Sequence, residues 1–366
     1  MKNILFYLGH PAQYHFAKNT ILQLKKDGFG VRVLIKTKDI LEELLQQDGV
    51  EYVNIQPHIR KNSRWSILMA SFRRTWRVVK EAKLVSAEML VGTDSSIAQA
   101  ARLLRIPSLT TLEDDIDVIG NLAKLTYPFT SYIVVPDVCK VGKWHSKKIG
   151  YCGYMKLAYL HPHYFSPDVL VLKKYGLEDK KYGIIRLAKL TAHHDTGTNG
   201  LNMKIVGDLI NICREVGYEV YITSERTLPP KLEKYRMQIE YTDIHHVLAF
   251  ASLLVSDSQS MSVEASMLGV PSLRYSDFSG RISVLEELEH KYALTIGIKT
   301  SEPDSLSGKL KELLSMPNLK EEWQRRREKM LADKIDVTAF LTWFIENYPE
   351  SARIMRENPD YQWRFR

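Results

Sequence analysis

The sequence predicts an α/β fold of two Rossmann-like domains that face a central cleft. Its 366 residues suit two domains of about 150 to 200 residues each. Apolar runs of strand length alternate with helical patterns in both halves, as in repeated strand-helix-strand units around a parallel sheet. This pattern starts again after about residue 180, and the restart predicts a second domain similar to the first.

The first half contains five apolar runs that read as parallel strands with helices between them. These runs are NILFYLG (3–9), VRVLIK (31–36), EMLVGTD (88–94), PSLTTLED (107–114) and SYIVVPD (131–137). The segment 161–183 follows with two prolines and a mixed charge cluster, as expected of an interdomain connection. We therefore assign residues 1–165 to an N-terminal domain.

The second half repeats the pattern with five further strands. They are YGIIRLAKL (182–190), YEVYITS (218–224), LLVSDS (253–258), VPSLRY (270–275) and ALTIGI (293–298). The clearest helix spans 199–217 and ends at Gly217. We assign residues 180–335 to a C-terminal domain and expect the helical tail, 336–366, to pack across both domains.

Composition restricts the classes of partner. Lys and Arg number 51 against 43 Asp and Glu, an excess that favours anionic partners, but no recognisable nucleic-acid module is present. The three cysteines, Cys139, Cys152 and Cys213, lack the spacing of a disulfide framework or a zinc site. No 18-residue apolar run and no signal-peptide pattern occur, so we expect a cytoplasmic protein, at most peripheral at the inner face of the membrane.

The stretch LLVSDSQSMSVEASMLG (253–269) predicts an anion site. A buried strand leads into small polar residues at a helix start, where backbone N–H groups and the helix dipole favour a phosphate. Glu264 lies about one turn into this helix, and its carboxylate can accept two hydrogen bonds from a ribose. The alternative is that Asp257 or Ser260 only caps the helix and Glu264 makes an ordinary first-turn contact.

Four residues of the first domain are candidate catalytic groups. His10 and His15 flank the start of the first helix, and a histidine in a cleft can accept a proton from a hydroxyl. Asp94 and Glu113 end neighbouring strands, where clustered carboxylates can share protons. The alternatives are that the histidines are capping or core residues and that the acids are helix caps.

A cationic loop follows the first strand of the C-terminal domain. Lys189, His193 and His194 lie in it, and they would neutralise the charge of a departing diphosphate without a metal ion. Arg274, in RYSDFSGR (274–281), is a further candidate contact to the same ligand. We expect no metal site.

The stretch SDSQSMSVEASMLGVPSLRY (256–275) resembles the SDSGG…EE…LG.P.L segment of the non-hydrolysing UDP-N-acetylglucosamine 2-epimerases and, more loosely, of GT-B glycosyltransferases. The resemblance implies GT-B architecture. It also implies that Ser258, Ser260, Met261 and Ser262 hold the diphosphate and that Glu264 holds the ribose. Gln259 and Ser260 replace the paired glycines of the epimerases, so the backbone should approach the pyrophosphate less closely.

Other motifs extend this resemblance. The GDT aspartate and the VEAG glutamate of the epimerases, which act in proton transfer, match Asp94 and Glu113, and the histidine of T.HRREN matches His193. His194 and Asp195 replace the arginine and the next polar residue of that last motif. The whole chain also resembles a family of unknown function in the same superfamily through GHPAQYHFAKN, LTTLEDD and LAKLTAHHDTG.

The sequence therefore predicts a metal-independent GT-B glycosyltransferase without a resident cofactor. The donor would be a nucleotide-diphosphate sugar, UDP-linked by resemblance, and the acceptor a glycan or a lipid-linked sugar. His10, His15, Asp94 or Glu113 would deprotonate the acceptor. The alternatives are a UDP-sugar 2-epimerase and a catalytically inactive module that binds nucleotide sugars.

The segment RWSILMASFRRTWRVVKEAK (64–83) predicts an amphipathic helix with basic residues beside its apolar stripe. The stripe comprises Trp65, Met69, Phe72, Trp76 and Val79. Arg73, Arg74, Arg77 and Lys80 lie off that face. We expect the stripe to face the core of the first domain, and the alternative is peripheral contact with an anionic membrane.

Overall fold

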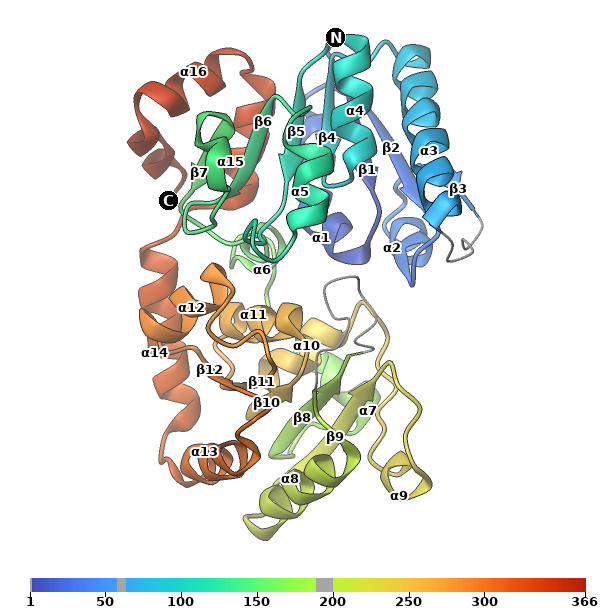
Figure 1. The fold of residues 1–366 in the computed structure, drawn as a ribbon. Helices are drawn as coiled ribbons and strands as arrows, with labels where there is room; N and C mark the ends of the chain where they lie inside the picture. The colour runs from blue at the N-terminus through green and yellow to red at the C-terminus, as the bar shows by residue number, and fades with distance from the viewer. Residues whose placement is uncertain (1, 58–63, 189–199) are drawn as a thin grey trace. The chain divides into compact units, whose positions relative to one another are not determined.

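The computed structural model describes residues 2–57, 64–188 and 200–366, and the side chains of these ranges except for 64–68. The chain divides into two compact units. The first contains residues 1–159 together with 334–366, and the second contains residues 160–333. Each unit is a parallel sheet with helices around it, so the predicted α/β fold of two Rossmann-like domains is confirmed (Figure 1).

The first unit is built on a seven-stranded parallel sheet in the order β3-β2-β1-β4-β5-β6-β7. The strands are β1 (Asn3–Leu8), β2 (Gly30–Lys36), β3 (Val53–Gln56), β4 (Met89–Gly92), β5 (Ser108–Thr111), β6 (Tyr132–Pro136) and β7 (Lys148–Tyr151). All five predicted strands are confirmed, and β3 and β7 were not predicted. Both are four-residue edge strands with polar residues, so neither forms a recognisable apolar run.

Helices cover the first sheet and include the end of the chain. They are α1 (Pro11–Lys26), α2 (Leu41–Gln47), α3 (Arg64–Leu84), α4 (Ser95–Leu104), α5 (Gly120–Thr126), α6 (Leu157–Leu160), α15 (Val337–Glu346) and α16 (Glu350–Glu357), with 3₁₀ segments Gly142–Lys147 and Pro359–Phe365. α1 packs against α15, whose Phe340 and Phe344 are fully buried. The C-terminal segment thus completes the core of the first unit.

The second unit contains a five-stranded parallel sheet in the order β12-β11-β10-β8-β9. The strands are β8 (Tyr182–Leu187), β9 (Glu219–Ser224), β10 (Leu253–Ser256), β11 (Ser272–Tyr275) and β12 (Thr295–Ile298), as predicted. Its helices are α7 (Leu170–Tyr175), α8 (Met203–Glu215), α9 (Pro230–Glu233), α10 (Ile244–Phe250), α11 (Gln259–Leu268), α12 (Ser283–His290), α13 (Pro303–Ser315) and α14 (Leu319–Ala332). Gly217, just beyond α8, has the left-handed φ of +80° expected after a helix end.

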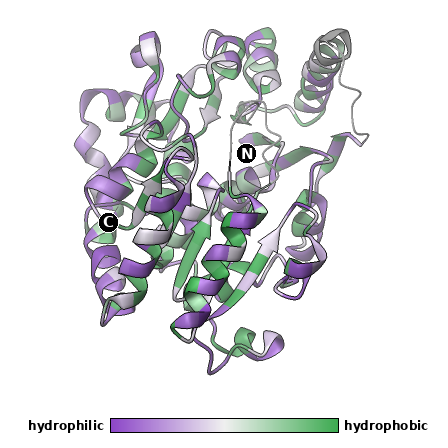
Figure 2. Cartoon of the chain, turned by 60° about the horizontal axis from the view of Figure 1, so that its bottom comes forward, coloured by the Kyte–Doolittle hydropathy of each residue, from purple (hydrophilic) through white to green (hydrophobic). Residues whose placement is uncertain are grey.

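Burial follows the alternation of strands and helices. Figure 2 shows hydrophobic residues along the strands and mixed hydropathy along the helices. In the first unit, Leu5 and Leu90 of the sheet form one buried cluster with Val78 of α3 and Ile97 of α4. One side of α3 and one side of α4 therefore pack on the sheet.

Strand order places a topological switch point in each sheet. β1 lies between β2 and β4, and β8 lies between β9 and β10, so the chain leaves each central strand on one side and returns on the other. In open α/β sheets, ligands bind beyond the carboxyl ends of the strands at such points. The loops after β1 and β4 carry His10 and Asp94, and the loops after β8 and β10 begin at Ala188 and Asp257.

Gly92, at the end of β4, allows close packing at the first switch point. A methyl group at this position would lie 2.7 Å from the carbonyl oxygen of Tyr7 and 3.2 Å from Cγ1 of Ile97. We expect Gly92→Ala to reduce the free energy of unfolding by about 1–3 kcal/mol, because backbone must move to admit the methyl group. Urea unfolding of the purified variant measures this difference.

Gly207 provides the matched control. It lies inside α8, and a methyl group there would meet no heavy atom within 4 Å. Gly207→Ala should therefore raise the free energy of unfolding by about 0.5–1 kcal/mol, since alanine favours a helix interior. Equal effects of the two substitutions would contradict the packing described for β4.

Candidate functional site

The loop between β10 and α11 forms the N-terminal cap of α11. The Ser258 Oγ accepts a hydrogen bond from the Met261 N–H at 3.4 Å, and the Ser258 N–H donates to the Ser256 Oγ at 2.8 Å. Ser258 is thus the capping residue, in place of Asp257 or Ser260. The helix begins at Gln259, so its first turn lies at the carboxyl end of β10, next to the switch point of the second sheet.

Only part of the predicted phosphate loop is exposed. Ser258 and Ser260 are partly exposed, whereas Met261 and Ser262 are buried. The Ser262 hydroxyl donates to the Ser258 carbonyl oxygen at 3.0 Å, inside the helix. The N–H groups of Gln259 and Ser260 belong to the first turn, where helical N–H groups lack a carbonyl partner within the helix, so they can bind an anion.

Asp257 ties this cap to the loop that follows β8. Its buried carboxylate accepts hydrogen bonds from the Ala188 N–H at 2.7 Å and the Leu201 N–H at 3.1 Å, and it pairs with Arg226. Burial raises the pKa of Asp257, while the Ala188 N–H and the charge of Arg226 oppose this rise. The residues that precede and follow the segment 189–199 are therefore both fixed beside the start of α11.

The three candidates of that segment, Lys189, His193 and His194, lie outside the described residues, and so does Asp195. Arg226 was not identified as a site residue from the sequence. Its guanidinium also donates to the carbonyl oxygens of Ala188 and Leu201, the latter at 2.9 Å. It therefore supports the same two ends of the segment that Asp257 holds.

Glu264 lies in the second turn of α11 and faces α10. Its Oε1 is 3.5 Å from Nε2 of His245, and both side chains are mostly buried. His245 also contacts Phe165 edge-on, with ring centroids 6.1 Å apart. The sequence did not link these residues, because a contact between side chains of different helices leaves no spacing signal.

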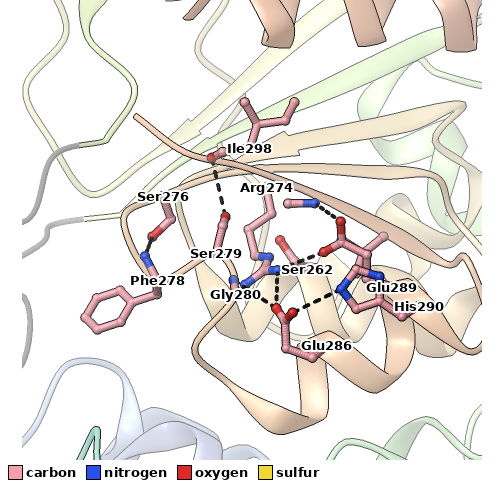
Figure 3. Close-up of polar contacts among 12 residues, drawn as sticks. Ser262, Arg274, Ser276, Phe278, Ser279, Gly280, Glu286, Glu289, His290 and Ile298 are labelled. Carbon is pink, nitrogen blue, oxygen red and sulfur yellow. Dashed lines mark hydrogen bonds and ion pairs between the residues drawn. The ribbon is translucent and has the colours of Figure 1, made fainter. Parts of the chain in front are cut away.

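Arg274 of β11 is surrounded by polar side chains (Figure 3) and contacts the first residue of α11. Its fully buried guanidinium lies 3.2 Å from Glu289 and 3.6 Å from Glu286, and it donates to the Gln259 Oε1 at 3.2 Å. Burial lowers the pKa of Arg274, and the two glutamates oppose this. Gln259 in turn donates to the Ser276 Oγ at 2.7 Å, so Arg274 orients the first residue of α11.

In the first unit, His10 follows the carboxyl end of the central strand β1 and caps α1. The Ala12 N–H donates to Nδ1 of His10 at 3.2 Å, and Nε2 lies 4.0 Å from Asp39. An accepting Nδ1 places the proton of the neutral ring on Nε2, so His10 cannot take up a proton without losing its cap. This geometry favours the capping interpretation of His10.

His15 is half-buried on α1 and stacks on Tyr159, with ring centroids 5.2 Å apart and an interplanar angle of 30°. The stacking fixes the plane of the imidazole. Because Pro11 is at the first helical position, His15 lies just over one turn from the start of α1. Both predicted histidines thus belong to the loop and helix that follow β1.

The two predicted acids each contact a cation. Asp94 caps α4 by accepting from the Ser96 N–H at 3.0 Å, and it lies 3.2 Å from Nε of Arg74. Glu113 accepts from the Met155 N–H at 3.2 Å and pairs with Lys156, which is buried. Asp94 and Glu113 follow the adjacent strands β4 and β5, as expected, but their two cationic partners were not identified from the sequence.

Comparison with known proteins identifies the fold class. No family model and no curated protein matches the sequence. Solved structures with the GT-B fold match over nearly the full chain, and the chain has this fold, as its resemblance to the epimerases and glycosyltransferases implied.

Three of these structures illustrate the similarity. The UDP-GlcNAc 2-epimerase from Neisseria meningitidis bound to UDP-GlcNAc has a TM-score of 0.69 at 14% identity, over 95% of this chain and 100% of its own. The S. aureus MnaA-UDP co-structure has a TM-score of 0.67 at 13% identity, over 96% and 98%. The spinosyn rhamnosyltransferase SpnG complexed with thymidine diphosphate has a TM-score of 0.63 at 12% identity, over 95% and 100%.

The Asp257 contacts generate a stability prediction. Asp257→Asn removes the charge that pairs with Arg226 and turns an amide N–H₂ toward backbone donors. We expect a loss of about 2–4 kcal/mol in the free energy of unfolding, measured by urea denaturation. The control is Glu233→Gln, which breaks an exposed, solvent-screened pair with Arg236 and should change the free energy of unfolding much less. A loss no larger than that of the control would show that Asp257 is not a structural anchor.

The surroundings of His10 generate a titration prediction. Partial burial lowers the pKa of His10 below its usual 6.5, Lys38 and Lys36 add to this, and Asp39 opposes it. The imidazole should therefore titrate below pH 6.5 in NMR spectra of the folded protein. Lys38→Gln should raise the midpoint and Asp39→Asn should lower it further, whereas Lys309→Gln on α13 should have no effect. A midpoint above 6.5 would refute this description.

Proposed function

We propose that this protein is a glycosyltransferase that transfers a sugar from a nucleotide-diphosphate sugar to a glycan or lipid-linked acceptor. One observation carries the proposal: the first turn of α11 presents backbone N–H groups at the switch point of the second sheet, with Glu264 one turn further on. A diphosphate fits the N–H groups, and a ribose fits the carboxylate. Solved structures of this fold that hold UDP, UDP-GlcNAc and thymidine diphosphate support a nucleotide of this class.

Within this proposal, the protein must stabilise the negative charge of the departing nucleotide diphosphate. As the bond from the sugar carbon to the diphosphate oxygen breaks, negative charge grows on the β-phosphate. The N–H groups of Gln259 and Ser260 would stabilise this negative charge. In our proposal, Lys189 and His193 of the segment that follows β8 would also neutralise it. No metal ion or cofactor is required for this step in our proposal.

The acceptor hydroxyl would lose its proton to a base at the carboxyl edge of the first sheet. His15 suits this role best among the four candidates, because stacking on Tyr159 holds its ring while His10 serves as a cap. Asp94 and Glu113 are each held by a cation and a backbone N–H group, so their carboxylates are less accessible to a hydroxyl of the acceptor as bases. They would orient the acceptor through its hydroxyl groups.

A second candidate function is 2-epimerisation of a UDP-sugar. It is favoured by the placement of Asp94 and Glu113 on adjacent strand ends, the positions that match the proton-transfer residues of the epimerases. Incubation with donor alone in deuterium oxide separates the two reactions. Deuterium at the second sugar carbon supports epimerisation, whereas sugar transfer requires an added acceptor and leaves that carbon unlabelled.

A third candidate is a catalytically inactive module that binds nucleotide sugars. It shares the proposed donor site but needs no base, so His15→Ala and Asp94→Asn would leave its biological output intact. Under the transferase proposal, His15→Ala reduces turnover by a factor of about 10² to 10⁴, as expected for loss of a base, and Asp94→Asn also lowers turnover because Asp94 would orient the acceptor.

The donor site is tested by a matched pair of substitutions at Gln259. Gln259→Ala removes the side chain that contacts Arg274 and keeps the N–H group, whereas Gln259→Pro removes both. Proline is tolerated at the first helical position, and the extended backbone of Ser258 suits a residue before proline. The difference between these variants therefore isolates one N–H donor.

We expect UDP to raise the melting temperature of the wild-type protein by mass action, with about 2.7 kcal/mol of stabilisation at a hundredfold excess over Kd. Gln259→Pro should bind UDP more weakly than Gln259→Ala by about 1.5–3 kcal/mol, the contribution of one hydrogen bond to a charged group. Isothermal titration calorimetry measures the affinities. If the two variants bind UDP equally, the first turn of α11 is not the phosphate site.

A further inference from the structure

The outer side of α3 carries apolar side chains that the first unit leaves exposed. Met69, Phe72 and Trp76 are 49%, 69% and 64% exposed, although they follow one another at the spacing of one helix face. The expectation that this stripe faces the core is therefore wrong for these three residues. Only Val79 of the predicted stripe is buried, and the side chain of Trp65 lies outside the described residues.

The core contact of α3 is made by a different face. Thr75, Val78, Val79 and Ala82 are buried, and three of them belong to the cluster shared with the first sheet and α4. Packing of α3 on its own unit thus does not need the exposed aromatic residues. An exposed Phe and an exposed Trp one turn apart require a separate explanation.

Basic residues share the exposed side with the apolar ones. Arg73, Arg77 and Lys80 are exposed and lie within one turn of Phe72 or Trp76. One turn further on, Leu84 is 71% exposed beside the exposed Lys83. The predicted arrangement, with basic residues off the apolar face, is therefore replaced by one mixed face, which we call the α3 outer face: Met69, Phe72, Arg73, Trp76, Arg77 and Lys80.

The net charge of the α3 outer face is positive because its acidic neighbour is already paired. Glu81 is the one acidic residue between 69 and 84, and it accepts hydrogen bonds from Arg32 of β2 at 2.8 and 3.2 Å. Arg74 points away from the outer face and pairs with Asp94. Arg77 donates a hydrogen bond to the carbonyl oxygen of Ile55, a neutral group that does not cancel its charge. Arg73 and Lys80 add two further exposed cations that can contact an external anionic partner.

We propose that the α3 outer face binds an anionic lipid surface. Interfacial helices combine aromatic residues, which enter the boundary between head groups and acyl chains, with Lys and Arg that contact anionic head groups. Met, Phe, Trp and Arg are also common in protein interfaces, so the net positive charge of the face is the observation that favours an anionic lipid surface. Within the described residues, no helix has the length and apolar character to cross a bilayer, so attachment of this kind would be peripheral.

This inference goes beyond sugar transfer and does not depend on it. Nucleotide binding is assigned to α11 in the second unit, whereas the α3 outer face belongs to the first unit. Substitutions on α3 should therefore leave the affinity for UDP unchanged. That separation allows either proposal to fail without the other.

The test is flotation of the full-length protein with phosphatidylcholine vesicles, with and without added phosphatidylglycerol. We expect binding only to the anionic vesicles, and less of it at high salt. The triple variant Arg73→Gln, Arg77→Gln, Lys80→Gln should bind at least tenfold more weakly, since each basic residue near an anionic surface contributes about a fivefold change in partitioning. Lys309→Gln with Lys311→Gln, on exposed positions of α13, removes two charges elsewhere on the surface and should bind like the wild type.

A second pair of variants tests insertion of the aromatic residues. Phe72→Ser with Trp76→Ser should abolish binding that survives at high salt, whereas Leu103→Ser and Leu170→Ser, at other exposed positions, should not. Lipids brominated in the acyl chain should quench tryptophan fluorescence of the wild type more than that of Trp76→Phe, which keeps an aromatic ring. Unchanged melting temperatures would show that all variants fold.

Three results would overturn the proposal. One is the absence of binding to anionic vesicles at low salt. Another is binding that the substitutions of the α3 outer face do not weaken. The third is a shift from dimer to monomer in Phe72→Ser with Trp76→Ser by light scattering, since a second copy of the chain would then cover this face.

Discussion

The contacts of Asp257 are the constraint on which the second unit depends. One buried carboxylate joins three parts of the chain: Ala188 just after β8, Leu201 two residues before α8, and Arg226 just after β9. The pairing of β8 with β10 brings the two loops to the same end of the sheet, and the Asp257 contacts then hold the loop after β8 against the start of α11. In this fold, a ligand would bind at the switch point of the second sheet. The Asp257 carboxylate holds together the loops after β8 and β10, which border that point.

Several candidate residues also cap helices. Ser258, Asp94 and His10 each accept a hydrogen bond from the first turn of the helix that follows a central strand. A cap that satisfies one N–H group leaves the other N–H groups of that turn for a ligand. The interpretations as cap and as binding site, which compete when only the sequence is read, are therefore compatible at Ser258. At His10 they are not, because the ring nitrogen that would accept a proton is the one that caps α1.

The sequence was sufficient for the features that depend on local pattern. All ten predicted strands are present, and Ser258 to Glu264 lie at a helix start beyond a strand end, because apolar runs and small polar residues mark both features directly. Pairings between distant segments could not be predicted, such as Arg74 with Asp94 or His245 with Glu264. The predicted orientation of α3 was wrong. Both faces of this helix contain apolar residues, and only the packing of neighbouring elements decides which face is buried. The edge strands β3 and β7 were missed because each is short and polar.

The position of α15 against α1 affects how the protein is made. Residues 334–366 belong to the first unit, yet the ribosome produces them after every strand of the second unit has emerged. The N-terminal sheet must therefore wait with an uncovered apolar surface on α1 while the later unit folds. Vectorial synthesis thus makes the unit that begins first the one that is completed last.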